Sequence, residues 1–191
     1  MILNAKNNQF VFYFGPNFWC DEVKTKYAEF YKSLLLPYDN IEDYMMSTLQ
    51  SINFPGIKID PVKQIGTYGR ERNYKGSEQI KDTMEKKCTL TFRLSEGFMN
   101  YIIFYNNFVR FLDFKNKSQN DEMYTLGVLN NEGFLVSTLK FYYPYITSIS
   151  DLSLDYTSAD NTMNKFTVSF VYNDWDIFFN YNEMINLYTM S

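Results

Sequence analysis

The 191-residue chain contains no histidine. Histidine is the commonest general base and proton shuttle near neutral pH, so Ser-His-Asp and Cys-His systems cannot be built from this sequence. A zinc site would lack its usual nitrogen ligands, and neither GxxxxGK[ST] nor GxGxxG, the common phosphate-binding patterns, occurs. We therefore expect a protein that is not an enzyme, with no catalytic residue, no cofactor and no metal site.

Cysteine and long apolar runs are also scarce, and each shortage narrows the cellular compartment in which we expect the protein. The two cysteines, Cys20 and Cys88, stand far apart without the CxxC spacing of a metal or redox site. We expect them to be reduced thiols in a reducing compartment. No apolar run reaches the ~18 residues of a membrane span, and the first residues lack the pattern of a signal peptide. The sequence therefore predicts a chain made in the cytoplasm without a membrane span.

Positive charge is in the minority, since 18 basic and 22 acidic residues give a net charge of −4. A protein that grips nucleic-acid phosphates usually shows a basic patch, so tight DNA binding is not expected. Asp39, Glu42 and Asp43 fit the start of a helix, where the helix dipole favours acidic side chains. Asp174 and Asp176 could ligate a cation, but the end of a solvated strand is the favoured interpretation.

Aromatic residues, in contrast, are abundant: 18 Phe and 17 Tyr bring the aromatic fraction to 19%. Flat side chains pack well across the strands of pleated sheets, and they are enriched at protein interfaces. A chain of this length can bury roughly 70% of its unfolded surface, so a self-sufficient core is expected.

Side-chain periodicity predicts strands for most of the chain and helices in three places. Gly, Pro and Asn/Asp clusters separate these segments. The expected elements, in chain order, are a strand over 9–14, a helix over 22–36 capped by Asp21, a helix from Asp39 or Asn40 to about residue 50, an interrupted strand over 57–65, a charged loop or extended hairpin over 66–87, a strand over 88–94, a helix over 97–113, a hairpin of 123–129 and 134–142, and two closing strands over 151–156 and 166–173.

The helix over 97–113 has an unusually aromatic face. Helical spacing places seven of its apolar residues on one side, and we interpret that side as core or oligomer contact rather than a cofactor site. These residues are Phe98, Tyr101, Ile102, Tyr105, Phe108, Val109 and Leu112. Together, the strands and this central helix predict an α+β protein, an antiparallel β-sandwich or small barrel.

Three local patterns follow one another along the chain. The first runs from Pro61 to Arg70 and continues through a charged loop with Gly76 into Thr89-Leu-Thr-Phe92. The second is the helix with Phe98, Phe104, Phe108 and Phe111. The third is Leu152-Ser-Leu-Asp-Tyr156, a turn with Ser158 and Asn161, then Phe166-Thr-Val-Ser-Phe170 and Trp175. In this order, the patterns resemble the tail tube proteins of bacterial viruses, whose relatives occur in the inner tubes of contractile injection machines.

The resemblance implies a sandwich or barrel of tail-tube type with one packed helix, in a single domain over 1–191. Two segments depart from the family pattern. They are a helical insertion over 22–50 and a C-terminal arm over 177–191, and both are typical of a specialised relative such as a tail hub protein.

The resemblance also implies a structural virion protein that forms rings, six-fold or a multiple of six, in the tail of a bacteriophage. Stacked rings would make a channel for DNA ejection, and the acidic balance suits DNA that passes without sticking. Free strand edges would be satisfied when neighbouring copies close the ring. Other tail and portal-proximal proteins would be partners, and the chain would be made in the host cytoplasm.

The charged loop and the arm are the expected inter-subunit contacts. Mixed charges suit register between subunits, and exposed aromatics would be buried against partners. The residues expected in these contacts are Arg70, Arg72, Lys75, Glu78, Lys81, Phe178, Phe179 and Tyr181. An alternative hypothesis is a monomeric β-barrel that binds a small apolar ligand in a deep internal pocket.

Overall fold

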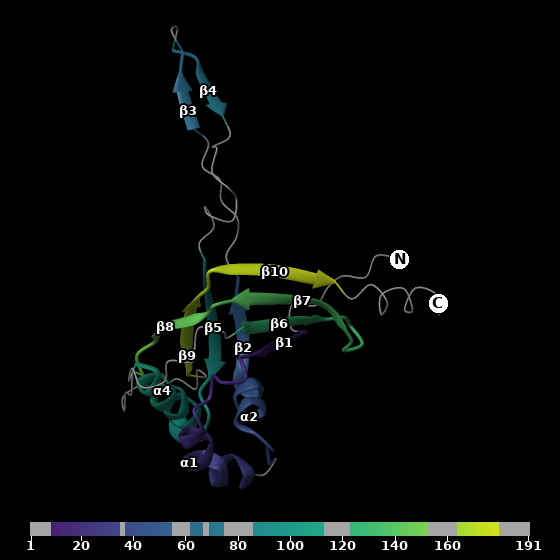
Figure 1. The fold of residues 1–191 in the computed structure, drawn as a ribbon, viewed down its shortest axis with the longest axis vertical. Coiled ribbons are helices and arrows are strands. Elements are labelled where there is room, and N and C mark those ends of the chain that lie inside the picture. The colour runs from purple at the N-terminus through teal and green to yellow at the C-terminus, as the bar shows by residue number, and fades with distance from the viewer. Residues whose placement is uncertain are drawn as a thin grey trace, which may run out of the picture.

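The computed structural model describes residues 9–34, 37–54, 62–66, 69–74, 86–112, 123–152 and 164–179. Ten strands and three α-helices are found in this part of the chain (Figure 1), which confirms the α+β class. The strands are β1 (Phe10–Tyr13), β2 (Leu49–Asn53), β3 (Val62–Ile65), β4 (Glu71–Tyr74), β5 (Lys87–Arg93), β6 (Met123–Leu129), β7 (Leu135–Tyr142), β8 (Tyr145–Ile149), β9 (Lys165–Val171) and β10 (Asp174–Phe179). The helices are α1 (Asp21–Lys32), α2 (Ile41–Thr48) and α4 (Met99–Leu112), with a short 3-10 turn η1 (Glu96–Phe98) before α4.

Eight strands form two antiparallel sheets of four strands each. Sheet A has the order β1-β6-β7-β10, and sheet B has the order β2-β5-β9-β8. The chain passes between the sheets four times. Two passages, from β1 to β2 and from β5 to β6, include helices, and the other two, from β7 to β8 and from β9 to β10, meet at one corner. At this corner the Asn173 backbone N–H donates to the Tyr142 carbonyl over 3.1 Å, which joins the two crossings. The strands of sheet A consequently run across those of sheet B (Figure 1).

An aromatic core lies between the two sheets. Alternation in β9 turns Phe166, Val168 and Phe170 to one side, and all three are buried. The ring of Phe170 lies 5.8 Å from that of Phe12 and 5.5 Å from that of Phe141, so β9 of sheet B contacts β1 and β7 of sheet A. The rings of Phe170 and Phe141 meet edge to face, and pairs of this kind add stability beyond the area they bury.

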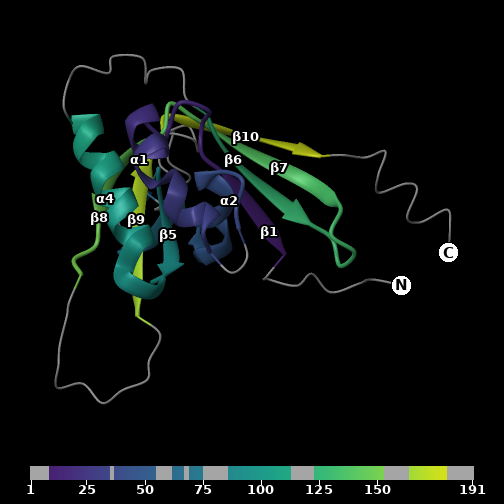
Figure 2. The same cartoon turned by 90° about the horizontal axis from the view of Figure 1, so that it is seen from below.

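The helices cover the rest of the same face of sheet B. Phe104 of α4 packs 4.9 Å from Phe92 of β5 and 5.8 Å from Phe166 of β9. Helix α1 then lies against α4, where Asn106 hydrogen-bonds Tyr27. Figure 2 shows α1, α2 and α4 gathered beside sheet B, while sheet A extends away from them.

The two N-terminal helices begin in different ways, and only α2 has a side-chain cap. Asn40 caps α2, because its side chain accepts the Asp43 backbone N–H over 2.8 Å. Asp21 was expected to cap α1, but the structure corrects this: Cys20 is the cap and Asp21 is the first helical residue. Helix α1 ends at Lys32, earlier than expected.

Several sequence expectations differ from the structure in the strands. The helix expected to reach residue 50 ends at Thr48, and β2 starts directly after it. Strand β8 occupies a segment between the expected hairpin and the two closing strands, where no element was expected. Strand β10 includes 177–179, which were assigned to the arm. Residues 57–61, 153–156 and 180–191, which hold parts of two expected strands and the rest of the arm, lie outside the described residues, and 151–152 are not in a strand.

Candidate assembly surfaces

Sheet A extends beyond the part of the molecule that covers it. On its core face, Phe12 and Phe141 are buried near the corner. The register places Val128, Ile177 and Phe179 on the same face, further along the strands. These three side chains are exposed, and Phe179 keeps 55% of its surface accessible. The apolar core face therefore continues past the point where sheet B and the helices end (Figure 2). We call this part, Phe10, Val128, Ile177 and Phe179, the sheet A tip.

The outer face of the same sheet is also partly apolar. Phe178 is 46% exposed there, and the Lys140 ammonium lies 4.7 Å from the centre of its ring. Gly127 allows the neighbouring strands to close over it, because an added Cβ would lie 2.7 Å from a Leu135 methyl and 2.9 Å from a Val11 methyl. The predicted contact residues Phe178 and Phe179 thus occupy opposite faces of β10, an edge strand of the sheet.

Sheet B shows a different surface on the side away from its core. Its register brings short hydroxyl and amide side chains together, and the Thr89 and Ser169 hydroxyls lie 3.2 Å apart. Charged residues of β5 and β9 stand at the strand ends, at Lys87, Arg93 and Lys165. The residues of this hydroxyl face are Ser51, Asn53, Thr89, Thr91, Ser148, Thr167 and Ser169.

Helix α4 buries a face that periodicity analysis did not identify. Asn100, Ile103, Phe104 and Asn107 point inward and are fully buried. The predicted face is instead turned outward in part: Ile102, Val109 and Tyr105 are exposed, and Tyr105 keeps 52% of its surface accessible. For these three residues the core interpretation is wrong, while contact with another subunit stays a prediction.

Hydrogen bonds explain why two polar side chains of α4, Asn100 and Asn107, face inward. Asn107 Nδ2 donates to the Phe18 carbonyl over 2.8 Å, and its Oδ1 accepts the Cys20 backbone N–H over 3.0 Å. Asn100 Nδ2 donates to the Arg93 carbonyl over 2.7 Å. Each amide satisfies backbone groups that would otherwise be buried without partners. An amide in a sequence gives no signal of such a role.

Strands β3 and β4 form a hairpin that Figure 1 shows standing apart from both sheets. Of the predicted contact residues, Arg70 and Arg72 belong here, and both are exposed. Lys63 Nζ lies 3.9 Å from Glu71 Oε2, and Ile65 is 73% exposed. The hairpin therefore offers basic and apolar side chains to solvent. Lys75, Glu78, Lys81 and Tyr181 lie outside the described residues.

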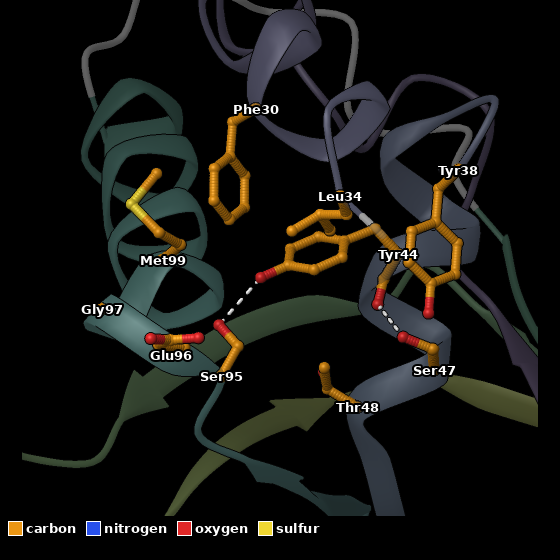
Figure 3. Close-up of a pocket in the computed structure, with 10 residues that line it drawn as sticks. All are labelled: Phe30, Leu34, Tyr38, Tyr44, Ser47, Thr48, Ser95, Glu96, Gly97 and Met99. Atoms are coloured by element: carbon orange, nitrogen blue, oxygen red, sulfur yellow. Dashed lines mark hydrogen bonds between the residues drawn. The ribbon is translucent and has the colours of Figure 1, made fainter. Parts of the chain in front are cut away.

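An open cleft of about 520 Å³ lies between α1, α2 and the start of α4. Its lining is largely aromatic and aliphatic (Figure 3), and the Tyr44 hydroxyl donates to Ser95 Oγ over 2.8 Å. The cleft lies among helices, whereas the ligand-binding alternative expected a pocket inside a barrel. The lining residues are Phe30, Leu34, Tyr38, Tyr44, Ser47, Thr48, Ser95, Glu96, Gly97 and Met99.

Burial strongly perturbs two titratable groups, Cys88 and Tyr172. Burial raises the pKa of the Cys88 thiol to about 12, so this sulfur stays protonated and unreactive near neutral pH. Burial likewise raises the pKa of the Tyr172 phenol to about 12. Within the described residues, no three His, Cys, Asp or Glu side chains gather as a metal site, and no helix there is long and apolar enough to cross a membrane.

The edge strands, the sheet A tip and the projecting hairpin are the candidate surfaces for contact with other chains. Three structures solved by cryo-electron microscopy share its fold. A chain of the anti-feeding prophage cap, the tube terminating cap, is 13% identical with a TM-score of 0.53, and the match covers 94% of this chain and 93% of that one.

The other two come from related assemblies. A chain of the PVC sheath/tube terminator, from an extracellular contractile injection system in its extended state, is 14% identical with a TM-score of 0.51 over 93% and 98% of the two chains. A chain of the 6-fold symmetrised anti-feeding prophage baseplate is 15% identical with a TM-score of 0.50 over 93% and 97%. The sequence significantly matches no protein-family model and no curated protein. The resemblance to tail-tube-like proteins of contractile injection systems is thus confirmed at the level of the fold.

Proposed function

We propose that this protein is a structural component of a phage-type tail, a tube, terminator or hub subunit that forms closed rings. The observation that carries the proposal is the sheet A tip, where an apolar core face continues into solvent. Exposed contiguous apolar surface marks interaction sites. The fold shared with chains of a tube terminating cap and a tube terminator supports the same assignment. No catalytic role is proposed, and a single tail-tube-like domain is the proposed organisation.

The two sheets would have different tasks in the ring. Edge strands β2 and β8 leave sheet B open to pairing with neighbouring copies, which would extend it around a central axis. Its hydroxyl face would then line the channel. A surface with few charges along the strands would release little counterion from DNA, so DNA could pass without binding.

The sheet A tip would meanwhile be buried against the next subunit of the ring. Ile177 and Phe179 project from its core face and would complete a core together with the neighbour. Symmetry of six is proposed because one structure of the same fold is a 6-fold symmetrised baseplate. The particle would be a bacteriophage virion whose channel serves DNA ejection, assembled in the host cytoplasm with other tail and portal-proximal proteins.

The test is assembly of the full chain over a wide concentration range. We expect the 22.8 kDa chain to form hollow rings or stacks in negative-stain micrographs, with matching mass by sedimentation. The double variant Ile177→Ser, Phe179→Ser should fold but fail to close rings, whereas Lys26→Gln on α1 should assemble normally. A wild-type chain that stays monomeric at every concentration, or a double variant that assembles as well as wild type, contradicts the proposal.

A further inference from the structure

The cleft between α1, α2 and α4 has rigid aromatic walls. The Tyr44 ring lies 5.7 Å from Phe30 and 5.6 Å from Tyr38, both in edge-to-face contact. Its hydroxyl is fixed by Ser95, whose Oγ in turn donates to the buried Asn100 Oδ1 over 3.1 Å. The walls are therefore set before any partner arrives, which lowers the entropic cost of binding.

One carboxylate lines this cleft. It belongs to Glu96, which is exposed and lies beside Ser95 in Figure 3. The surrounding helices are acidic on balance: residues 21–34 and 37–48 contain six acidic and three basic side chains. Aromatic faces next to a carboxylate are the surroundings that attract a guanidinium or an ammonium group.

The β3–β4 hairpin has the complementary character. Its described residues, 62–66 and 69–74, contain three basic side chains and one acidic one. Arg70 lies in the turn between β3 and β4, where its carbonyl accepts the Gly66 N–H over 3.0 Å. Gly69 just before it has a φ of +69°, a left-handed conformation that costs glycine little and so keeps this turn tight.

The hairpin and the cleft lie toward opposite ends of the molecule. In Figure 1, which sets the longest axis vertical, the hairpin is at the top and α1 and α2 are at the bottom. Copies stacked head to tail along this axis would bring the hairpin of one copy to the helices of the next. Such a contact joins two different surfaces and so continues from copy to copy.

We propose that the cleft receives Arg70 from the β3–β4 hairpin of a second copy in the adjacent ring. The guanidinium would lie against the aromatic rings of Tyr38 and Tyr44 and pair with Glu96. Arginine suits this place better than lysine because its planar group stacks on rings and binds carboxylates through two N–H groups. The contact rests on the proposed ring-stacking function and assigns it a specific donor and acceptor.

Charge reversal in the full chain tests the pairing. Arg70→Glu and Glu96→Arg should each raise the concentration at which rings stack about tenfold, since the charge and ring contacts are both lost. Combining the two reversals should restore stacking to nearly the wild-type concentration. Stack length in micrographs and light scattering give the readout, while ring closure is scored separately in the same samples.

Two variants that each replace a basic side chain with a neutral one separate the cleft contact from general charge attraction. Arg70→Gln and Lys63→Gln each remove one positive charge from the same hairpin, and only Arg70→Gln should weaken stacking strongly. Equal effects, or a double reversal without rescue, would overturn the cleft contact while the ring proposal stands. Loss of all assembly by the wild-type chain would instead contradict the ring proposal itself.

Discussion

The two-sheet body and the projecting parts of this molecule are built on different principles. In the body, aromatic side chains such as Phe170 touch three or more other rings and are fully buried. In the sheet A tip and the β3–β4 hairpin, side chains of the same apolar types stand in solvent, among them Phe179 and Ile65. The contrast teaches that the body stabilises the fold, while the projections expose apolar side chains that the proposed assembly would bury.

The strongest test of this comparison is to truncate one phenylalanine in the body and one in the sheet A tip. Phe170→Ala removes a ring that joins β9 to three strands of sheet A, and large-to-small changes of this kind cost about 3–5 kcal/mol. Phe179→Ala, nine residues further on in the sheet A tip, should change the free energy of unfolding by about 0.5 kcal/mol or less. Urea unfolding monitored by circular dichroism measures both. Comparable losses would mean that β10 belongs to the core.

The next largest loss of stability is expected at Asn107, whose side chain hydrogen-bonds the loop before α1. Asn107→Leu would leave the Phe18 carbonyl and the Cys20 N–H without their amide partners, at a cost of about 1–3 kcal/mol each. The matched control is Arg110→Gln, which breaks the ion pair with Glu22 between the same two helices. That pair is largely exposed and should contribute about 1 kcal/mol or less. Equal losses in the two variants would contradict the role assigned to Asn107.

Sequence reasoning found the elements whose periodicity is strong and missed those that depend on tertiary contacts. Strand β9 was predicted almost to the residue because alternation and a single buried face agree there. Helix α4 was predicted as an element, but its buried face was not. Apolar spacing favoured Ile102, Tyr105 and Val109, and nothing local shows that Asn100 and Asn107 are needed inside.

The same reasoning explains the errors at β2 and β8. Each strand has only five residues, carries a register shift and depends on a longer central strand, β5 or β9, for its hydrogen bonds. Such edge strands are set by pairing rather than by their own composition. Of the residues expected in inter-subunit contacts, Arg70, Arg72, Phe178 and Phe179 are exposed, and their contact role stays a prediction. The cleft joins residues between 30 and 48 to residues 95–99, and no local pattern indicates that these segments meet.

A pH dependence distinguishes the sealed core from the open projections. Cys88 has an ordinary pKa of 9.0, which burial raises to about 12 in the folded protein. The unfolded chain therefore releases this proton first, and stability present in full below pH 9 is lost as pH rises toward 12. For this group the loss between pH 9 and 10 should be about 1 kcal/mol. The measurement is the slope of unfolding free energy against pH, which should be shallower in Cys88→Ala. Identical slopes would mean that Cys88 is accessible in the folded state.

The smallest effect on stability is expected in the hairpin, because a hairpin outside the core should contribute little to the free energy of unfolding. The Lys63–Glu71 pair joins two side chains that are 64% and 61% exposed, so solvent screens the attraction and the net contribution should be about 0–0.5 kcal/mol. Lys63→Gln should therefore leave the thermal unfolding midpoint unchanged within error. A loss above about 1 kcal/mol would show that the hairpin unfolds together with the body. It would then be part of the folded core rather than a contact element whose side chains are stabilised only when another copy binds them.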